Sequence, residues 1–482
     1  MKRRTFLRAS LQAGVLGALQ GRARGALQHG RPNILWIMLD DCRPDALGCY
    51  GRPWVRTPAL DRLAASGAFF ENAVTQCPIC VPSRTSMKTG LYCHRFGLMS
   101  MGEAPDTPPP YAYKNGAGND MLRAWHRHGQ KPFNIGKVHA FAEDWSPLGD
   151  LRAVKEARPD SGGTTYPEVK LTTHRWKIGG TIDVHPDDTT SGRIAGAAME
   201  ALGNLDAAAP WFLRLSFLAP HVPIEVPASF MVDPSTVNLP RPTQAELDSK
   251  PRFEREQLRV YAGTSDISDR DLQIARGSYY GMVNLVDHHV GRVLEAMQSQ
   301  GLLENTMVVV NSDHGLQLGE HGLHKKRNFY DQTIKAPLVV SWPGVIPAGQ
   351  RREELVEMVD SLPTLLDLSG LPVPGKIDGK TLVPLLTGKG AAGREAVFAE
   401  IDHSGSMYDE LRHDSGRRVM VRTRDWKLEY FKDPRVMDPD GAMYDLQRDP
   451  GETVNLYGDA QHAAVRADLE GLVDAWDTRT VR

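Results

Sequence analysis

The 482-residue chain has little net charge, few cysteines and no long apolar run. Lysines and arginines number 57 against 59 aspartates and glutamates, so the formal net charge is −2. This balance argues against a nucleic-acid-binding protein built on a basic surface. No segment is apolar enough for a transmembrane helix, so we do not expect an integral membrane protein. The five cysteines are not needed as disulfides, because a chain of this length with 41% hydrophobic residues can bury a large core.

The first 26 residues have the pattern of an export signal. Residues 2–8 are basic, residues 9–19 form a short, weakly apolar stretch, and a zone of small residues follows. The Arg3-Arg4-x-Phe6-Leu7 arrangement resembles a twin-arginine signal. A basic tail without fixed structure is the alternative. We therefore expect residues 1–26 to be a signal peptide read by the twin-arginine (Tat) export machinery, which predicts a periplasmic or secreted protein.

Beyond residue 31, apolar runs alternate with helical patterns. Residues 33–39 form a continuous apolar run, which is typical of a buried strand in a parallel sheet. Similar runs lie at 132–136, 211–218, 307–311 and 338–342, and helical patterns lie at 57–67, 191–205, 275–300 and 358–369. The alternation predicts an α/β fold in which helices sandwich a large, mostly parallel sheet.

The pattern changes near residue 394. Short strand-like pieces at 397–400, 417–422, 426–431 and 442–445 precede an amphipathic helix at 461–476. We therefore expect a large N-terminal domain over residues 31–393 and a smaller subdomain of antiparallel sheet plus helix over 394–482. Loops rich in glycine and proline at 102–119, 146–190 and 222–272 are too long for plain connections and are expected to shape a pocket.

Polar residues follow four of the apolar runs. Open α/β sheets bind their ligands outside the carboxyl ends of their strands. A single histidine would by default be an ordinary core or surface residue, but repeated placement at strand ends favours a common site. The residues in question are Asp40, Asp41, Lys137, His139, His221, Asp313 and His314.

The adjacent carboxylates of Asp40 and Asp41 indicate a bound cation. Two neighbouring carboxylates repel each other unless a cation neutralises them, and oxygen ligands suit a hard divalent ion such as Ca²⁺ or Mg²⁺. Helix capping by Asp41 or Asp313 is the alternative. The Asp313-His314-Gly315 sequence after a second strand favours the metal interpretation.

The most informative segment runs from Cys80 to Gly90. Its sequence Cys80-Val-Pro-Ser-Arg84, continued by Thr89-Gly90, resembles the sulfatase signature Cys-x-Pro-Ser-Arg-x-x-x-x-Thr-Gly. In that family the cysteine is oxidised to formylglycine, whose hydrated aldehyde has two hydroxyls. One attacks sulfur, and the other later allows sulfate to be expelled. A Cys77-x-x-Cys80 redox or metal motif is the alternative, but it leaves the rest of the signature unexplained.

Further segments resemble the same family, which lies within the alkaline-phosphatase-like superfamily. They are Gly136-Lys-x-His139, the Ala-Pro-His221 segment, residues 320–331 and the tail motif at 443–456. In residues 320–331, His324 stands where tryptophan is usual and Lys325 where a small residue is usual. Spacing to Phe329-Tyr330 selects Lys326 as the sulfate-binding lysine, with Lys325 as the alternative.

The resemblance implies a role for each candidate residue. The metal ligands would be Asp40, Asp41, Asp313, His314 and the formylglycine at Cys80, with Ca²⁺ favoured over Mg²⁺. Arg84, Lys137 and Lys326 would bind the sulfate group. His139 would take a proton from the free hydroxyl as sulfate leaves, and His221 would contact the bridging oxygen.

We therefore expect a hydrolase that cleaves a sulfate monoester and releases inorganic sulfate, with a sulfated carbohydrate preferred as substrate. A formylglycine-generating or sulfatase-maturating enzyme would be its partner, and Tat export of the folded protein fits modification before export. A phosphonate monoester or phosphodiester hydrolase that uses the same site is one alternative. A non-catalytic glycan-binding relative is another, although it predicts the loss of at least one key residue.

Overall fold

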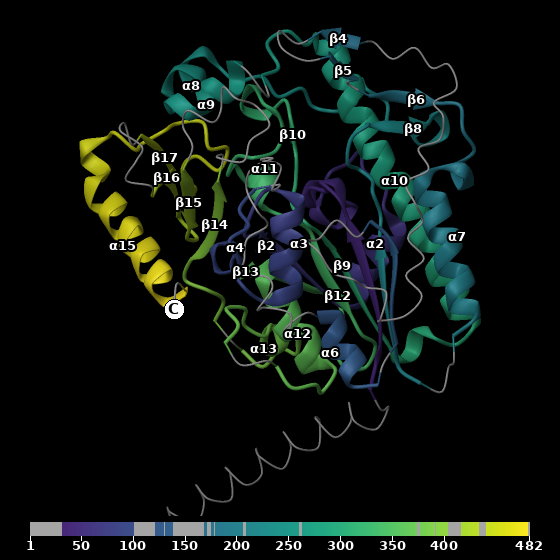
Figure 1. The fold of residues 1–482 in the computed structure, drawn as a ribbon. Helices are drawn as coiled ribbons and strands as arrows, with labels where there is room; N and C mark the ends of the chain where they lie inside the picture. Colours follow the sequence, from purple (N-terminus) through teal and green to yellow (C-terminus); the bar gives the residue numbers. More distant parts are fainter. Residues whose placement is uncertain are drawn as a thin grey trace, which may run out of the picture.

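A computed structural model shows a central sheet covered by helices on both faces (Figure 1). It describes residues 31–100, 121–129, 131–137, 168–170, 175–177, 179–205, 209–259, 263–373, 376–390, 392–402, 416–432 and 440–480. The predicted signal peptide and His139 lie outside these residues. No helix in the described ranges is both long and apolar enough to cross a membrane.

The central sheet has seven strands in the order β13-β2-β12-β9-β1-β7-β3. Strand β12 is antiparallel to both of its neighbours, whereas the other pairings in the sheet are parallel. The strands are β1 (Asn33–Leu39), β2 (Ala68–Val74), β3 (Lys131–Gly136), β7 (Trp211–Ser216), β9 (Thr306–Ser312), β12 (Leu338–Ser341) and β13 (Gln350–Glu357). This mostly parallel sheet confirms the predicted fold class.

Strand β1 shows how the sheet is buried on both faces. Alternate side chains of a strand point to opposite faces, and here both sets are apolar. Leu35 and Ile37 pack into the core with helices α2 (Pro58–Ser66), α7 (Thr190–Gly203) and α10 (Asp269–Ser299). Ile34 and Trp36 pack on the other face, where the covering helices are α3 (Cys80–Thr89), α6 (Met121–Arg127), α12 (Ser361–Leu368) and α13 (Val383–Leu386).

The C-terminal part contains the expected antiparallel sheet and helix. Its strands are β14 (Val397–Asp402), β15 (Arg417–Arg422), β16 (Trp426–Phe431) and β17 (Gly441–Asp445), paired in chain order. Helix α15 (Ala463–Thr480) lies along the outside of this sheet (Figure 1) and buries Leu469, Val473 and Trp476 against it. Tyr92 and Val359 of the larger part belong to the same apolar cluster, so the two sheets share a packed boundary.

Short elements connect these layers. Two-stranded sheets pair β4 (Glu168–Lys170) with β5 (Arg175–Lys177), β6 (Gly180–Ile182) with β8 (Glu225–Pro227), and β10 (Gln317–Leu318) with β11 (His324–Lys325). Short helices are α4 (Cys93–Phe96), α8 (Gln244–Ser249), α9 (Arg252–Gln257) and α11 (Asp331–Ile334).

Candidate active site

The parallel part of the sheet places the candidate residues at one edge. Strands β9, β1, β7 and β3 are consecutive neighbours. Asp313 follows β9, Asp40 follows β1, His221 lies five residues beyond β7, and Lys137 follows β3. Because the carboxyl ends of parallel strands lie at one edge of a sheet, residues far apart in the chain meet there.

Helix α3 brings Cys80 to this edge. The helix begins at Cys80 itself, and its last residue is followed by Gly90 in the left-handed conformation (φ 70°) that glycine adopts readily. All ten residues of the helix are buried. The Ser83 hydroxyl donates a 2.6 Å hydrogen bond to the backbone carbonyl of Asp313, which ties the first turn of α3 to the end of β9.

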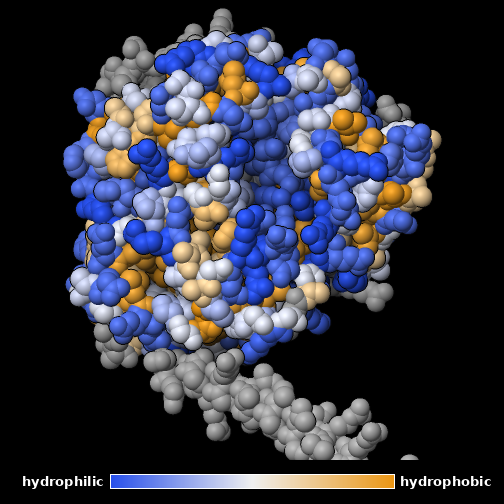
Figure 2. Space-filling model, turned by 180° about the vertical axis from the view of Figure 1, so that it is seen from behind, coloured by the Kyte–Doolittle hydropathy of each residue, from blue (hydrophilic) through white to orange (hydrophobic). Residues whose placement is uncertain are grey.

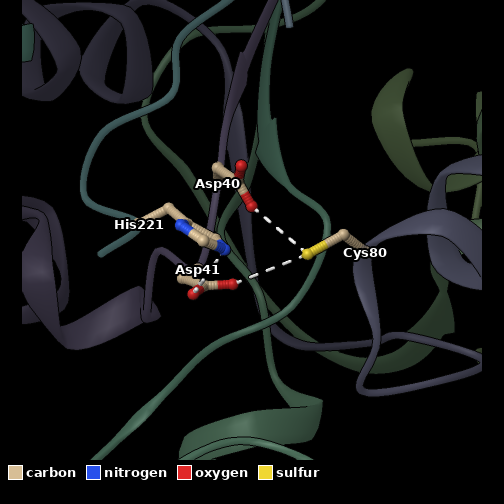
Figure 3. A group of neighbouring side chains, drawn as sticks. All are labelled: Asp40, Asp41, Cys80 and His221. Carbon is tan, nitrogen blue, oxygen red and sulfur yellow. Dashed lines mark hydrogen bonds and ion pairs between the residues drawn. The ribbon is translucent and has the colours of Figure 1, made fainter. Parts of the chain in front are cut away.

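The thiol of Cys80 lies between carboxylates, an imidazole and an ammonium group. Its Sγ is 3.5 Å from Oδ1 of Asp40 and 3.9 Å from Oδ1 of Asp41, and both contacts are drawn in Figure 3. His314 Nε2 lies 3.3 Å from the same sulfur, and Lys326 Nζ lies 2.9 Å from it. Only 1% of Cys80 is exposed, so its side chain is enclosed by these polar groups.

Three cations compensate the carboxylates. Arg84 Nε donates to Asp313 Oδ2 at 2.7 Å, and its NH2 group lies 3.7 Å from Asp40 Oδ2. Lys137 forms an ion pair with Asp40, and Lys326 Nζ donates to Asp41 Oδ1 at 2.6 Å. Cys80, at the first residue of α3, therefore faces an anionic cluster that is surrounded by positive charge.

The two buried carboxylates respond differently to this environment. Burial, reinforced by the nearby charge of Asp313, raises the pKa of Asp40 to about 6. Burial also pushes the pKa of Asp313 upward, but His314 and Arg84 outweigh it and hold that pKa below its usual range. A bound divalent cation would favour the ionised form of Asp40, because its positive charge would offset the repulsion between the neighbouring carboxylates.

The donor set fits a hard divalent ion. One group of possible ligands contains Asp40, Asp41, Cys80 and His221, and a second contains Cys80, Asp313 and His314. Within each group the ligand atoms lie within 4.8 Å of one another. Three of the six residues in the combined set are aspartates, whose carboxylate oxygens suit Ca²⁺ or Mg²⁺.

His221 lies beside the carboxylates on the more open side of the site. Its Nε2 is 3.9 Å from Asp41 Oδ2 (Figure 3), and its Nδ1 is within 2.8 Å of the Val222 carbonyl. Its side chain is 24% exposed, compared with 1% for that of Asp41. Burial alone would lower the pKa of His221, but the charges of Asp41 and Asp40 raise it to about 9. The ring can therefore carry a proton at neutral pH in this arrangement.

The loop between β11 and α11 distinguishes the two lysines. Lys326 Nζ contacts Cys80 and Asp41, whereas Lys325 belongs to β11 and pairs with Gln317 across the small hairpin. Lys325 and Arg327 both have left-handed backbone angles, with φ of 74° and 76°. Burial and the neighbouring Arg327 lower the pKa of Lys325 to about 8. The side chain that reaches Cys80 is therefore Lys326, the lysine selected by spacing.

The geometry does not favour the Cys-x-x-Cys interpretation. The Cys77 thiol contacts the Cys93 thiol and lies 3.8 Å from the Met99 carbonyl, within an apolar cluster. Cys80, in contrast, faces the carboxylates. The two cysteines of the motif therefore lie in different environments.

Sequence reasoning missed several residues that support the site. Ser216, the last residue of β7, accepts a 3.1 Å hydrogen bond from Arg84 NH1. Tyr279 on α10 contacts the backbone on both sides of Cys42. Nothing in the local sequence marks either residue, because both lie inside regular elements and act through long-range contacts.

Comparison with known families agrees with this geometry. The sulfatase family model matches residues 32–371, which is more than half of the chain. The chain belongs to the sulfatase family. A second model, for the C-terminal part of N-sulphoglucosamine sulphohydrolase, matches residues 319–478. The protein is thus a hydrolase of the family that acts on sulfuric ester bonds, within the alkaline-phosphatase-like superfamily.

Individual relatives resemble this sulfatase over nearly their whole length. An arylsulfatase from Clostridium perfringens is 26% identical over 465 residues, which cover 90% of this chain and 91% of the relative. An N-acetylglucosamine-6-O-sulfatase from Bacteroides thetaiotaomicron is 27% identical, covering 92% of this chain and 86% of the relative. The crystal structure of the phosphonate monoester hydrolase of Agrobacterium radiobacter has a TM-score of 0.76 at 26% identity, covering 93% of this chain and 96% of that chain.

Proposed function

We propose that this sulfatase hydrolyses a sulfate monoester of a carbohydrate through a formylglycine formed from Cys80. The observation that carries the proposal is the position of the Cys80 thiol, 2.9 Å from Lys326 Nζ and within 4 Å of both Asp40 and Asp41. A nucleophile at this position has cations beside it and carboxylates able to hold a metal. The hydrated aldehyde would provide one hydroxyl for attack on sulfur and a second for the release of sulfate.

The metal ligands would be Asp40, Asp41, Asp313 and His314, with residue 80 completing the set. We propose Ca²⁺ in preference to Mg²⁺. A bound divalent ion supplies charge that lowers the pKa of an attacking hydroxyl and stabilises the transferring group. The protein's part is to hold its carboxylates fixed, as the contacts of Asp313 with Arg84 and of Asp41 with Lys326 do.

The sulfate group would be held by Arg84, Lys137 and Lys326. Charge spreads over the nonbridging oxygens as the group is transferred, and preorganised cations stabilise it most. Protonated His221 would donate toward the bridging oxygen of the leaving group. The family resemblance assigns the proton-accepting role to His139.

A polar substrate suits the surface of the molecule. The face turned away from the view of Figure 1 has a hydrophilic hollow in its upper half (Figure 2). The Bacteroides relative is a sulfatase of N-acetylglucosamine, a sugar. The sugar in this relative's name supports a sulfated carbohydrate as the substrate class. Export of the folded protein by the Tat machinery, after modification of Cys80 by a maturating enzyme, would bring it to such a substrate.

A paired assay tests the proposed reaction. The formylglycine-containing enzyme should hydrolyse an aryl sulfate and members of a panel of sulfated sugars, with release of inorganic sulfate. The matched aryl phosphonate monoester and phosphodiester should react with lower kcat/KM. Higher kcat/KM on the phosphorus esters than on every sulfate ester would replace the proposal by its alternative.

That alternative is a phosphonate monoester or phosphodiester hydrolase. The structural similarity to the Agrobacterium radiobacter enzyme fits this alternative, but at 26% identity it is no stronger than the similarity to the sulfatase relatives. Sulfate and phosphate monoesters differ by one charge, and the same cations can bind either group. A non-catalytic glycan-binding relative would lack at least one key residue, but Cys80, Arg84 and Asp313 are all present, so this alternative is not supported.

Lys326→Ala should lower kcat much more than Lys325→Ala. A cation that stabilises charge in the transition state contributes mainly to kcat, and losing one such donor costs on the order of 10²–10³. Lys326 contacts Cys80, whereas Lys325 lies in the hairpin, so Lys325→Ala serves as the matched control. The check is kcat and KM on an aryl sulfate. A larger loss for Lys325→Ala would make Lys325 the sulfate ligand.

A further inference from the structure

The turn that follows β1 has an unfavourable backbone conformation, which hydrogen bonds to other segments stabilise. Asp41 adopts a left-handed conformation with φ of 62°, which is uncommon for residues other than glycine. Its backbone N–H donates to Asp313 Oδ1 at 3.1 Å, and the next N–H, that of Cys42, donates to the Ser312 hydroxyl at 2.9 Å. These contacts tie the turn to the end of β9.

Two further backbone groups of the turn are hydrogen-bonded by a single side chain. The Tyr279 hydroxyl donates to the Asp41 carbonyl at 2.7 Å and accepts from the Arg43 backbone N–H at 2.9 Å. Tyr279 is fully buried and lies on α10, a helix of 31 residues that packs against α2 and α7. The hydroxyl therefore joins both sides of the turn to one of the most extensively packed elements of the fold.

A partly buried ion cluster extends this link to the segment that precedes Lys326. Glu320 Oε1 accepts from Arg43 NH1 at 2.8 Å and from Arg276 NH1 of α10 at 2.8 Å. Its other oxygen accepts from the Leu318 backbone N–H at 2.8 Å. One hydrogen-bonded network thus connects the turn at Asp41, helix α10 and the segment before Lys326.

We propose that Tyr279 is a positioning residue that fixes the carboxylate of Asp41 for metal binding, an inference that rests on the proposed function. Asp41 Oδ1 lies 2.6 Å from Lys326 Nζ and 3.4 Å from His314 Nδ1, so a rotation of the turn would move it away from the other ligands. Groups that orient metal ligands through hydrogen bonds typically change metal affinity by about 10–100-fold when they are lost.

The neighbouring tyrosine provides a matched control. Tyr280 is also fully buried on α10 and packs edge-on against Tyr279, but its hydroxyl has no hydrogen-bond partner among the described residues. Each tyrosine-to-phenylalanine change removes one buried oxygen atom from the same turn of the same helix. The difference between the two variants therefore isolates the hydrogen bonds to the Asp41 turn.

The test is calorimetric titration of metal-stripped protein with CaCl₂ and, separately, MgCl₂. We expect the Kd of Tyr279→Phe to rise about 10–100-fold over that of the wild type, while Tyr280→Phe keeps the wild-type Kd. Excess metal should restore most of the kcat of Tyr279→Phe, because the variant retains every ligand. An unchanged Kd for Tyr279→Phe would overturn the inference, as would an equal rise for Tyr280→Phe.

A second variant covers the case in which Tyr279→Phe does not fold. Ser312→Ala removes the contact with the Cys42 backbone in the same turn, together with a 3.3 Å contact to Asp313 Oδ1, and should raise the Kd in the same direction. An unchanged Kd for this variant would then overturn the inference. If the wild-type protein bound neither ion, the metal site of the proposed function would itself be overturned. That result differs from one in which the wild type binds metal and the Kd of the variant is unchanged, which would overturn only the role of Tyr279.

Discussion

Cys80→Ala is expected to abolish turnover of sulfate esters while leaving the protein folded. Removal of the nucleophile from a serine hydrolase lowers kcat on the order of 10⁶-fold, and a loss of that size is expected here. The thiol contacts polar groups of the site rather than the apolar core, so the melting temperature should change little. Steady-state kinetics and a thermal unfolding scan measure the two effects.

The matched control is Cys49→Ala. Cys49 is a half-buried cysteine outside the site, so its replacement should leave kcat unchanged. The Cys80→Ser variant adds a sharper test. Its hydroxyl can accept a sulfuryl group but has no second hydroxyl on the same carbon to expel it, so we expect at most one turnover and sulfate retained on residue 80. Sustained turnover by Cys80→Ser or Cys80→Ala would contradict the proposed role of the formylglycine.

Asp40→Ala is expected to abolish turnover and the stabilisation of the protein by divalent metal. Ligand binding to the folded state stabilises it by about 4 kcal/mol at 1,000 times Kd. Wild-type protein should therefore unfold at a higher temperature with CaCl₂ than with a chelator, and its activity should be lost on exhaustive chelation. Asp40→Ala should show no such difference, because one carboxylate of the site is missing.

A buried aspartate elsewhere in the fold provides the control for this experiment. Asp287 on α10 accepts hydrogen bonds from the backbone of Ala59 and Leu60 at the start of α2. Asp287→Asn should lower stability, but the difference in melting temperature between CaCl₂ and chelator should remain. Full activity after chelation, with metal analysis showing no bound ion, would contradict the metal site.

The main features of the fold could be predicted because parallel strands that are buried on both faces have continuous apolar sequences. The apolar runs at 33–39 and 307–311 became the paired central strands β1 and β9. Strands β2 and β13 were missed. Strand β2 follows α2 with only Gly67 between them, and β13, at the edge of the sheet, begins with the charged sequence Gln-Arg-Arg-Glu-Glu. The antiparallel direction of β12 was not expected either, since direction depends on pairing partners that a local pattern does not reveal.

The candidate site could be predicted in part for a similar reason. Asp40, Asp313 and Cys80 stand at element boundaries where a short motif marks them, and the structure brings them together. Tyr279 and Ser216 carry no such signal, because their partners lie 238 and 132 positions away in the chain. His139 lies outside the described residues, so its role remains a prediction of the resemblance.

The central claim is that sulfate ester hydrolysis depends on a formylglycine at position 80. Mass spectrometry of the peptide that contains residue 80, from preparations of graded activity on an aryl sulfate, tests it most directly. We expect the side chain to have lost its thiol sulfur and gained an aldehyde oxygen, and kcat per protein molecule to rise in proportion to the modified fraction. A fully active preparation in which residue 80 is entirely unmodified cysteine would contradict the account.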